Sequence, residues 1–160
     1  MVKLIITDID GCLSPEDSSA WDPELFGSLM NLARKASARR TTLAPITLCT
    51  GRPQPYVEPL AKLLDIRMPI ICENGAVVYS LDDNWSRFGP GVTNEKLEGL
   101  RAVRRFIERE ILPAHPEALY QFGKEAMLSV YSADPRILPH IQQAIADHIH
   151  DRELPPVVMG

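Results

Sequence analysis

The chain has 160 residues, 45% of them hydrophobic, which is enough for one compact domain or for one core with a small addition. Its net charge is −4 and its pI is about 5.6, so it lacks the basic surface that binding to nucleic acid or to an anionic membrane requires. No apolar run approaches the roughly 20 residues that cross a bilayer, and the N-terminus lacks the features of a secretory signal, so we expect a cytoplasmic protein.

The first half of the chain reads as alternating strands and helices. Residues 2–9 (VKLIITDI) form a short apolar run, which predicts a fully buried parallel strand. Asp22, Pro23 and Glu24 supply an N-cap, a proline and an acid in the order that begins a helix, which we expect over residues 23–40. The elements that follow are a strand at 44–50 (APITLCT), a helix at 56–65 (YVEPLAKLLD) and a strand at 68–73 (MPIICE).

This order of strand, helix, strand, helix, strand is typical of an α/β fold with a parallel sheet. Because the crossovers are right-handed, the carboxyl ends of the three strands should meet at one edge of the sheet. These ends are residues 8–10, 49–52 and 72–75. Open α/β sheets bind ligands at this edge, so it is the predicted place of the functional site.

The second half has a different pattern. Asn74 and Gly75 begin a turn into an antiparallel strand at 76–80, and residues 81–93 (LDDNWSRFGPGVT) are expected to form a linker or hinge. Then come an amphipathic helix at 94–112, a hairpin around Gly123 with its better strand at 124–132, and a helix from Asp134 to His150. We therefore divide the chain into an α/β part, residues 1–82, and a second module, residues 83–160.

Two carboxylates stand close together where the first strand ends. Asp8 and Asp10 are two positions apart on an extended segment, so both side chains project to the same side. Neighbouring carboxylates repel, so either one keeps a proton, as a general acid needs, or a divalent cation neutralises the pair. Mg²⁺ prefers oxygen ligands of this kind. Gly11 allows the chain to turn sharply after the pair.

The end of the second strand offers a place for an anion. In the sequence LCTGRP, Thr50 and Gly51 precede a helix, so a hydroxyl and backbone N–H groups face the same side. The phosphate of a substrate suits these donors. Together with the two aspartates, the pattern indicates phosphoryl transfer in which an aspartate attacks phosphorus and forms an aspartyl-phosphate.

Three motifs, each at an expected strand end, resemble one known family. DIDGC at 8–12, CTGRP at 49–53 and CENGA at 72–76 are similar to the haloacid dehalogenase superfamily of phosphatases. More narrowly, they resemble its branch with a C2-type α/β cap: the Cof-type, sucrose-phosphatase-like and phosphoglycolate-phosphatase-like enzymes. The resemblance implies a Rossmann-like core at 1–82 and a cap domain, incomplete here, at 83–160.

The resemblance also implies roles for individual residues. Asp8 matches the nucleophile and a Mg²⁺ ligand, and Asp10 matches the general acid/base whose backbone carbonyl also faces the metal. Thr50 matches the residue whose hydroxyl binds the phosphoryl group, and Gly51 gives its backbone room. Arg52 and Asn74 match positions that line the cleft and contact substrate. The expected cofactor is Mg²⁺ and the expected substrate a small phosphorylated metabolite, of the sugar phosphate or phosphoglycolate class.

One part of the family pattern is missing. The family completes its site with a lysine and with an acidic pair in a GDxxxD-like motif, and no such motif follows residue 80. The remaining aspartates make poor replacements because they fall in a linker or at helix ends: Asp82, Asp83, Asp134 and Asp151. We therefore expect a shortened chain, a proteolytic product or one half of a split enzyme, with an apolar sheet edge left uncovered on residues 1–82.

Two other functions stay open. The chain could be a non-catalytic module that binds phosphate or a partner chain and needs a C-terminal half for activity, or a phosphomutase that uses the same aspartyl-phosphate. Neither nucleic acid nor a membrane is expected as a partner, whereas a homo-oligomer or a complementing C-terminal chain stays open. The three cysteines, Cys12, Cys49 and Cys72, have no paired spacing and are expected to be small buried hydrophobic residues.

Overall fold

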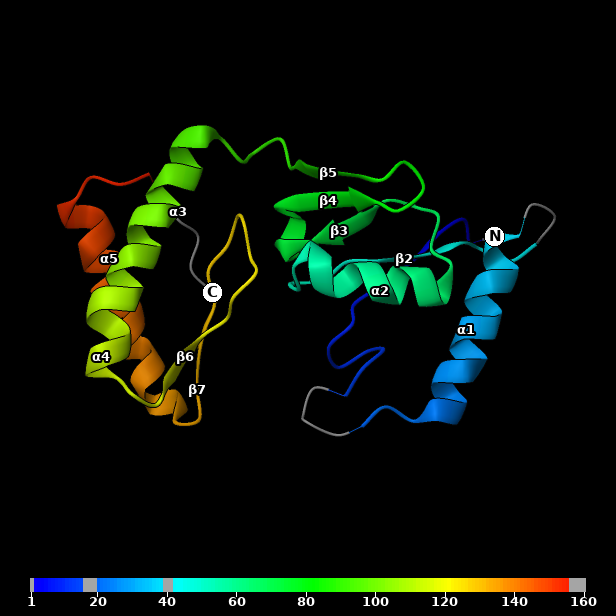
Figure 1. The fold of residues 1–160 in the computed structure, drawn as a ribbon, viewed down its shortest axis with the longest axis horizontal. Helices are drawn as coiled ribbons and strands as arrows, with labels where there is room; N and C mark the ends of the chain where they lie inside the picture. The colour runs from blue at the N-terminus through cyan, green and yellow to red at the C-terminus, as the bar shows by residue number, and fades with distance from the viewer. Residues whose placement is uncertain (1, 16–19, 39–41, 156–160) are drawn as a thin grey trace. The chain divides into compact units, whose positions relative to one another are not determined.

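The computed structural model describes residues 2–15, 20–38 and 42–155. The chain divides into two compact units, Met1–Gly89 and Pro90–Gly160, and each is described by itself. Strands and helices alternate in the first unit, and the second places a hairpin between helices (Figure 1). This mixed α/β architecture is the predicted fold class. The assignment of residues 1–82 to a core and of 83–160 to a cap stays a prediction.

The strands of the first unit follow one another across the sheet in chain order. Strand β1 (Ile5–Thr7) pairs in parallel with β2 (Ile46–Leu48). A parallel bridge between Cys49 and Ile71 joins the end of β2 to β3. The remaining strands form an antiparallel sheet in the order β3 (Ile70–Cys72), β4 (Val77–Ser80), β5 (Trp85–Phe88). The carboxyl ends of β1, β2 and β3 therefore lie at one edge, as the strand–helix pattern predicts.

Helix α1 (Pro23–Ser37) begins where the sequence predicts. The carboxylate of Asp22 accepts hydrogen bonds from the N–H groups of Glu24, at 2.9 Å, and Leu25, at 3.1 Å. These two donors have no partner within the helix, so the aspartate satisfies them and fixes the first turn. Helix α1 packs against α2 and β2.

Helix α2 (Gln54–Leu64) forms the core of this unit together with β2. Pro53 precedes its first turn, and Asp65, with a left-handed φ of 54°, ends it. One face of the helix is buried, namely Val57, Leu60, Ala61 and Leu64, as is every residue of β2. Burying each of the larger aliphatic side chains contributes about 1.5–3 kcal/mol, so this layer holds the edge that carries the predicted site.

The prediction of a fully buried first strand is wrong. Strand β1 has only three residues, and its side chains are exposed: 43% at Ile5 and 55% at Ile6. These two side chains point to opposite faces of the sheet, so both faces are uncovered at this position. Among the described residues, no strand pairs with the outer edge of β1. An apolar run shows only that a strand can be buried, not that a covering layer is present.

The predicted linker at 81–93 contains a strand. Strand β5 pairs antiparallel with β4, with Ser80 opposite Trp85 and Val77 opposite Phe88. Asn84, with φ at 50°, makes the turn that reverses the chain. In the sequence, Trp85 and Phe88 stand among polar residues, glycines and a proline, a composition that favours a linker. The pairing with β4 outweighs this local preference.

The second unit is built on one long helical segment. Helix α3 (Asn94–Phe106), a π-helical turn (Ile107–Ile111) and the short helix α4 (Leu112–Ala114) follow without a break, which confirms the helix predicted at 94–112. Helix α5 (Leu138–Asp151) follows a short 3-10 turn (Pro135–Ile137), and Asp134 caps that turn through the N–H of Arg136, at 3.0 Å. The core between these elements contains Val103, Ile107, Ile111, Ala118, Tyr120 and Ile141.

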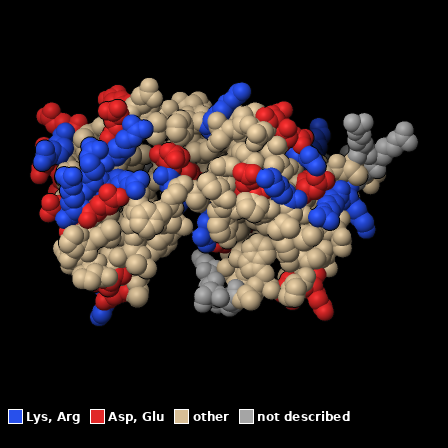
Figure 2. Space-filling view, viewed as in Figure 1, with Lys and Arg blue, Asp and Glu red and all other residues tan. Residues whose placement is uncertain are grey.

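The hairpin of the second unit is shorter than predicted. Strand β6 (Ala118–Tyr120) pairs with β7 (Val130–Ser132), so residues 124–129 are outside the strand expected at 124–132. Figure 2 shows basic and acidic side chains intermingled over α3, where Arg101 contacts Glu98 at 3.8 Å and Arg104 contacts Glu108 at 2.8 Å. This is the solvated, ion-paired helix face that alternating charges favour. In the described part of the chain, no helix has the length and apolar character to cross a membrane.

Candidate active site

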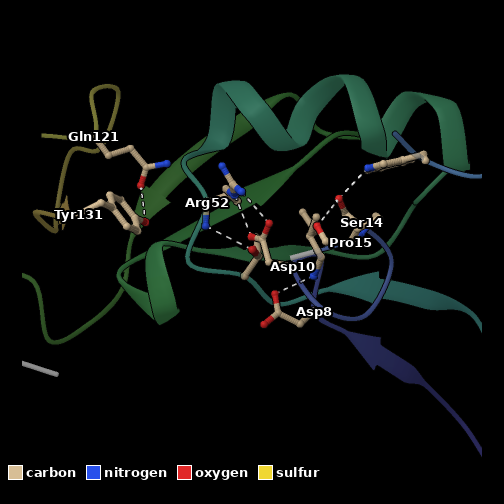
Figure 3. A network of polar contacts seen from close by, with 10 residues as sticks. Asp8, Asp10, Ser14, Pro15, Arg52, Gln121 and Tyr131 are labelled. Atoms are coloured by element: carbon tan, nitrogen blue, oxygen red, sulfur yellow. Dashed lines mark hydrogen bonds and ion pairs between the residues drawn. The ribbon is translucent and has the colours of Figure 1, made fainter. Parts of the chain in front are cut away.

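The loop after β1 carries the two predicted aspartates. Ile9 is fully buried, whereas its neighbour Asp8 is exposed and the Asp10 side chain is 30% exposed. The buried isoleucine therefore anchors the segment and leaves both carboxylates on the outer side, as the spacing of two positions predicts. Figure 3 shows Asp8 and Asp10 extending from the start of this one loop.

A tight turn closes the loop behind the aspartates. The carbonyl of Ile9 accepts hydrogen bonds from the N–H groups of Leu13 and Ser14, both at 2.8 Å, and the N–H of Gly11 donates to the Ser14 carbonyl at 2.9 Å. Gly11 has φ at 71°, a left-handed conformation that a glycine adopts without strain. The glycine is therefore explained by the turn. The turn fixes the backbone on which Asp10 stands.

Asp8 is restrained at one of its two oxygens. Its Oδ1 accepts a hydrogen bond from the N–H of Ile9 at 2.6 Å, which turns the carboxylate back toward its own backbone. The side chain is otherwise exposed, so a substrate can reach it. An exposed carboxylate held at one oxygen has the accessibility that a nucleophile requires.

The end of β2 forms the second part of the site. The N–H of Thr50 donates to the Ile71 carbonyl at 2.9 Å, which extends the parallel pairing by one residue. Thr50 is only 2% exposed, and its Oγ1 accepts a hydrogen bond from the N–H of Arg52 at 3.2 Å. The hydroxyl therefore shapes the turn of this loop, and its single hydrogen is left to donate elsewhere.

The end of β3 forms the third part of the site and is hydrogen-bonded to the end of β2. The N–H of Glu73 donates to the Arg52 carbonyl at 3.2 Å, and the N–H of Asn74 donates to the Thr50 carbonyl at 3.1 Å. Glu73, Asn74 and Gly75 all have left-handed φ angles, at 49°, 53° and 97°. For a non-glycine residue this conformation costs of order 1 kcal/mol, and the two hydrogen bonds help to offset that cost at Glu73 and Asn74.

The side chain of Asn74 lies over Gly51. A Cβ atom added at Gly51 would lie 3.1 Å from the Asn74 Oδ1, which is closer than ordinary van der Waals contact. A side chain at this position of the CTGRP motif would therefore need the Asn74 side chain, from the third strand end, to shift by a few tenths of an ångström. This contact joins two of the residues that the sequence predicted to bind substrate.

Arg52 joins the second strand end to the first. Its Nε donates to the Asp10 Oδ2 at 2.8 Å and its Nη2 donates to the Asp10 Oδ1 at 2.6 Å (Figure 3). Such a two-point contact fixes the orientation of both groups. The sequence predicted a proton or a metal ion as the way to relieve repulsion between Asp8 and Asp10. In the structure, a guanidinium supplies positive charge to Asp10.

The structure thus brings the predicted residues together at one edge. Hydrogen bonds or side-chain contact link Asp10, Thr50, Gly51, Arg52 and Asn74 into one cluster, and Asp8 lies two residues from Asp10. Their chemical roles stay predictions. The sequence missed Tyr56, whose ring lies beneath the Arg52 guanidinium, with 4.8 Å between the Cζ atom and the ring centroid. The sequence signal that could have found it is that Tyr56 follows Arg52 by four positions, at the start of the expected helix.

The cysteines differ in their surroundings. Cys72 is fully buried at the end of β3, and burial, with smaller contributions from Glu73 and Cys49, raises the pKa of its thiol to about 12. It is the small hydrophobic residue that the sequence predicted, and its thiol stays protonated. Cys12 is exposed in the loop that follows Asp10, so for this residue the prediction of burial is wrong.

The site offers some of the ligands that Mg²⁺ prefers. The exposed carboxylate of Asp8 and the backbone carbonyl of Asp10 are oxygen donors of the right kind. Within residues 2–15, 20–38 and 42–155 no group of three or more His, Cys, Asp or Glu side chains could hold a metal ion. Asp82 contacts Arg67 at 2.6 Å and Asp83 accepts from Ser80 at 3.0 Å, so both have structural roles. The donors fit a magnesium ion but do not surround one.

Known proteins support the family that the three motifs indicate. Residues 5–98 match the family described as haloacid dehalogenase-like hydrolase. No curated protein sequence matches the chain significantly.

Several solved structures have a similar fold. A Thermoplasma acidophilum protein has a TM-score of 0.61 and 18% identity over 92% of this chain and 58% of its own. The C-terminal domain of the C. albicans trehalose-6-phosphate phosphatase has a TM-score of 0.65 and 14% identity over 93% of this chain and 49% of that one. A haloacid dehalogenase-like hydrolase from Bacteroides thetaiotaomicron has a TM-score of 0.50 and 21% identity, over 68% and 39%. The chain therefore spans about half the length of the structures it matches.

Proposed function

The chain belongs to the haloacid dehalogenase-like hydrolases, and from this premise we propose that it is a Mg²⁺-dependent phosphomonoester hydrolase acting through an aspartyl-phosphate at Asp8. The proposed substrate is a small phosphorylated metabolite of the sugar phosphate or phosphoglycolate class. The observation that carries the proposal is the pairing of an exposed Asp8 with an Asp10 held by Arg52, at the edge where parallel strands end.

In the first half of the reaction an Asp8 oxygen attacks phosphorus. The new bond forms as the bond between phosphorus and the leaving oxygen breaks, and Asp10 gives its proton to that oxygen. The free alcohol departs and the phosphoryl group stays on Asp8. A magnesium ion held by the Asp8 carboxylate and the Asp10 carbonyl would supply positive charge to the phosphoryl oxygens.

In the second half water replaces the alcohol. Asp10 takes a proton from the water, the water oxygen attacks phosphorus, and the bond to Asp8 breaks, so inorganic phosphate leaves and both aspartates return to their starting state. In the structure both Asp10 oxygens accept hydrogen bonds from Arg52, as an ionised carboxylate does. This arrangement matches Asp10 at the point between the two halves, after it has given its proton to the leaving oxygen and before it takes one from water.

The position of the other loops supports the proposal that they bind phosphate. Thr50, Gly51 and Asn74 lie within one hydrogen-bonded cluster beside Arg52, so their donors share the side of the sheet on which the aspartates stand. A transferring phosphoryl group carries its charge on the outer oxygens, and donors that are fixed in advance stabilise it without reorganisation.

The test is release of phosphate from an aryl phosphate in the presence of Mg²⁺. We expect Asp8→Asn to lower the rate on the order of 10³-fold or more, because the nucleophile is lost. Asp22→Asn is the matched control, because asparagine caps a helix as well as aspartate does, and it should keep the wild-type rate. An Asp8→Asn variant with the wild-type rate would overturn the assignment. With a sugar phosphate as substrate instead, isomerised sugar phosphate in place of free phosphate would indicate a mutase.

One observation favours a second candidate. The exposed Ile5 and Ile6 of β1 offer an apolar edge, which suits a module that is active only with a partner chain. This candidate predicts no turnover by the bare chain and turnover after a complementing chain is added. Turnover by the 160-residue chain alone would exclude it.

A further inference from the structure

Gly89 is the last residue of the first unit, and it lies against the turn that carries Asn74. Its N–H, just after strand β5, donates to the Ala76 carbonyl at 2.9 Å. A Cβ atom added at Gly89 would lie 2.6 Å from the carbonyl oxygen of Gly75, far inside van der Waals contact. Gly89 therefore faces two successive carbonyl groups of the chain that leaves the turn.

The Gly75 oxygen, not backbone conformation, explains the glycine at position 89. In the described part of the chain the glycines with positive φ are Gly11, Gly75 and Gly123, so Gly89 is not in the left-handed region. Gly91, two residues further on, is also outside that region, and a Cβ added there would meet nothing within 4 Å. A methyl group therefore fits at position 91 and clashes with backbone at position 89.

The Gly75 oxygen belongs to a peptide group that closes the turn. The N–H at the other end of this group, from Ala76, donates to the Glu73 carbonyl at 3.0 Å. Because a peptide group is planar and stiff, a push on its oxygen also moves its N–H. A displacement that starts at Gly89 therefore passes into the turn.

Asn74 lies inside this closed turn and contacts the loop at the end of β2. Its N–H donates to the Thr50 carbonyl at 3.1 Å. Its Oδ1 lies 3.1 Å from the position of a Cβ atom at Gly51. A movement of the turn therefore changes where the Asn74 side chain lies relative to the predicted phosphate-binding loop.

The connection between the two units begins at Gly89 and is short. The carbonyl of Gly91 accepts a hydrogen bond from the Lys96 Nζ at 2.8 Å, at the start of α3. Pro90 lies between the two glycines, and its ring fixes its φ angle. A change in the direction of this connection therefore falls on a few backbone angles, and those of Gly89 are beside the Gly75 oxygen.

We propose that Gly89 is a positioning residue that couples the connection between the two units to Asn74. The backbone of the connection bears on the Gly75 carbonyl, so a displacement at Gly89 is transmitted to the asparagine. The inference rests on the proposed function for its consequence, namely that Asn74 contacts the substrate. The contact itself is independent of turnover.

The test compares Gly89→Ala with Gly91→Ala by NMR in the full 160-residue chain. The two glycines flank Pro90, and a methyl group clashes only at the first of them. The signals to follow are the backbone amide of Gly51 and the side-chain amide of Asn74, which is assigned by its loss in Asn74→Asp. We expect both signals to shift in Gly89→Ala and to keep their wild-type positions in Gly91→Ala.

The kinetics of aryl phosphate hydrolysis measure the consequence. Displacement of Asn74 should raise KM about two- to ten-fold in Gly89→Ala, the loss of one hydrogen bond to the substrate, and Gly91→Ala should keep the wild-type KM. In an Asn74→Gly background, Gly89→Ala should raise KM no further, because the donor is already absent. An equal rise in both backgrounds would show that the methyl group does not act through Asn74.

Two NMR results would overturn the inference. One is a Gly89→Ala variant, folded by the backbone amides of α1, in which the Asn74 and Gly51 signals are those of the wild type. The other is an equal shift of these signals in Gly91→Ala, because any change in the connection would then have the same effect.

The reverse measurement decides the matter if Gly89→Ala does not fold. Asn74→Gly should shift the backbone amide of Gly89 and leave that of Gly91 in place, and an unchanged Gly89 amide would refute the coupling. These signals do not depend on turnover. A chain that shows the expected shifts but releases no phosphate would contradict the proposed function alone, so the two proposals can fail separately.

Discussion

At the scale of single residues, Gly51 and Asn74 show how a side chain at one strand end limits the size of the side chain at another. Any side chain at position 51 would meet the Asn74 Oδ1, at 3.1 Å from the first added carbon. Asn74 in turn is held at a left-handed φ of 53° by its N–H bond to the Thr50 carbonyl. Neither residue can be changed without consequences for the other.

We predict that Gly51→Ala lowers the free energy of unfolding by about 1 kcal/mol, because the added methyl group displaces the asparagine. In an Asn74→Gly background the same change should cost less than about 0.5 kcal/mol, since the obstructing side chain is gone and glycine accepts the left-handed φ. Urea unfolding of the two single variants and the double variant measures both costs. Equal costs in the two backgrounds would show that the contact does not limit position 51.

Cys12 and Cys72 should differ in reactivity. At pH 8 the thiol of Cys72, whose pKa is raised to about 12, holds only about one thiolate in 10⁴ molecules. Exposed Cys12 should be alkylated by iodoacetamide in the folded protein, and Cys72 only after unfolding. Peptide mapping after alkylation distinguishes them, and equal rates for the two in the folded chain would contradict the described burial.

The raised pKa of Cys72 also makes the stability of the folded chain depend on pH. The folded pKa of Cys72 lies above its ordinary value of 9.0, so the folded state holds the proton more tightly than the unfolded state does. The stabilisation of the folded state by the protonated Cys72 thiol is complete below pH 9 and is lost as the pH rises toward 12. Substitution of Cys72 by alanine should therefore flatten the alkaline fall in stability.

The residues of the site were more predictable than their contacts. Asp8, Asp10 and Thr50 stand out because a polar group at the end of an apolar strand is unusual, whereas Arg52 and Asn74 are indicated only by the resemblance to the family. That Arg52 bonds to Asp10, which is 42 residues away in sequence, follows from the reach of one side chain across the strand ends and has no local signal. The exposure of Cys12 likewise depends on how the loop turns after Gly11.

At the scale of elements, neighbouring strands of one sheet have opposite surroundings. Ile6 of β1 is 55% exposed, whereas Leu48 of β2 is fully buried. We predict that Ile6→Ala costs less than about 1 kcal/mol in the free energy of unfolding, and that Leu48→Ala costs about 2–5 kcal/mol because it opens a cavity. Urea unfolding of both variants is the measurement. Similar costs would mean that β1 is covered in solution.

Elements with strong local signals were predicted and those that depend on pairing were not. The caps at Asp22 and Asp134 begin helical turns as their sequences indicate. The sequence predicts a linker where strand β5 lies, because only the pairing with β4 makes this segment a strand, and it predicts too long a strand at β7 for the same reason. Strand formation needs a partner, and a single segment does not show one.

At the scale of the whole molecule, three short motifs carry most of the functional information. They predict the family correctly, and the match over residues 5–98 confirms it. The solved structures with this fold are 14–21% identical to the chain, so they show the fold and not the substrate. The second unit has none of the three motifs, and the substrate that it would help to select stays a proposal.

The central claim is that Asp8 carries the phosphoryl group during turnover. The direct measurement is to quench the chain with borohydride while it hydrolyses an aryl phosphate with Mg²⁺, because borohydride reduces an aspartyl-phosphate to homoserine. The account predicts homoserine at position 8 in the wild type, with none in Asp8→Asn and none when substrate is omitted. Phosphate release without homoserine at position 8, or homoserine at a different aspartate, would contradict it.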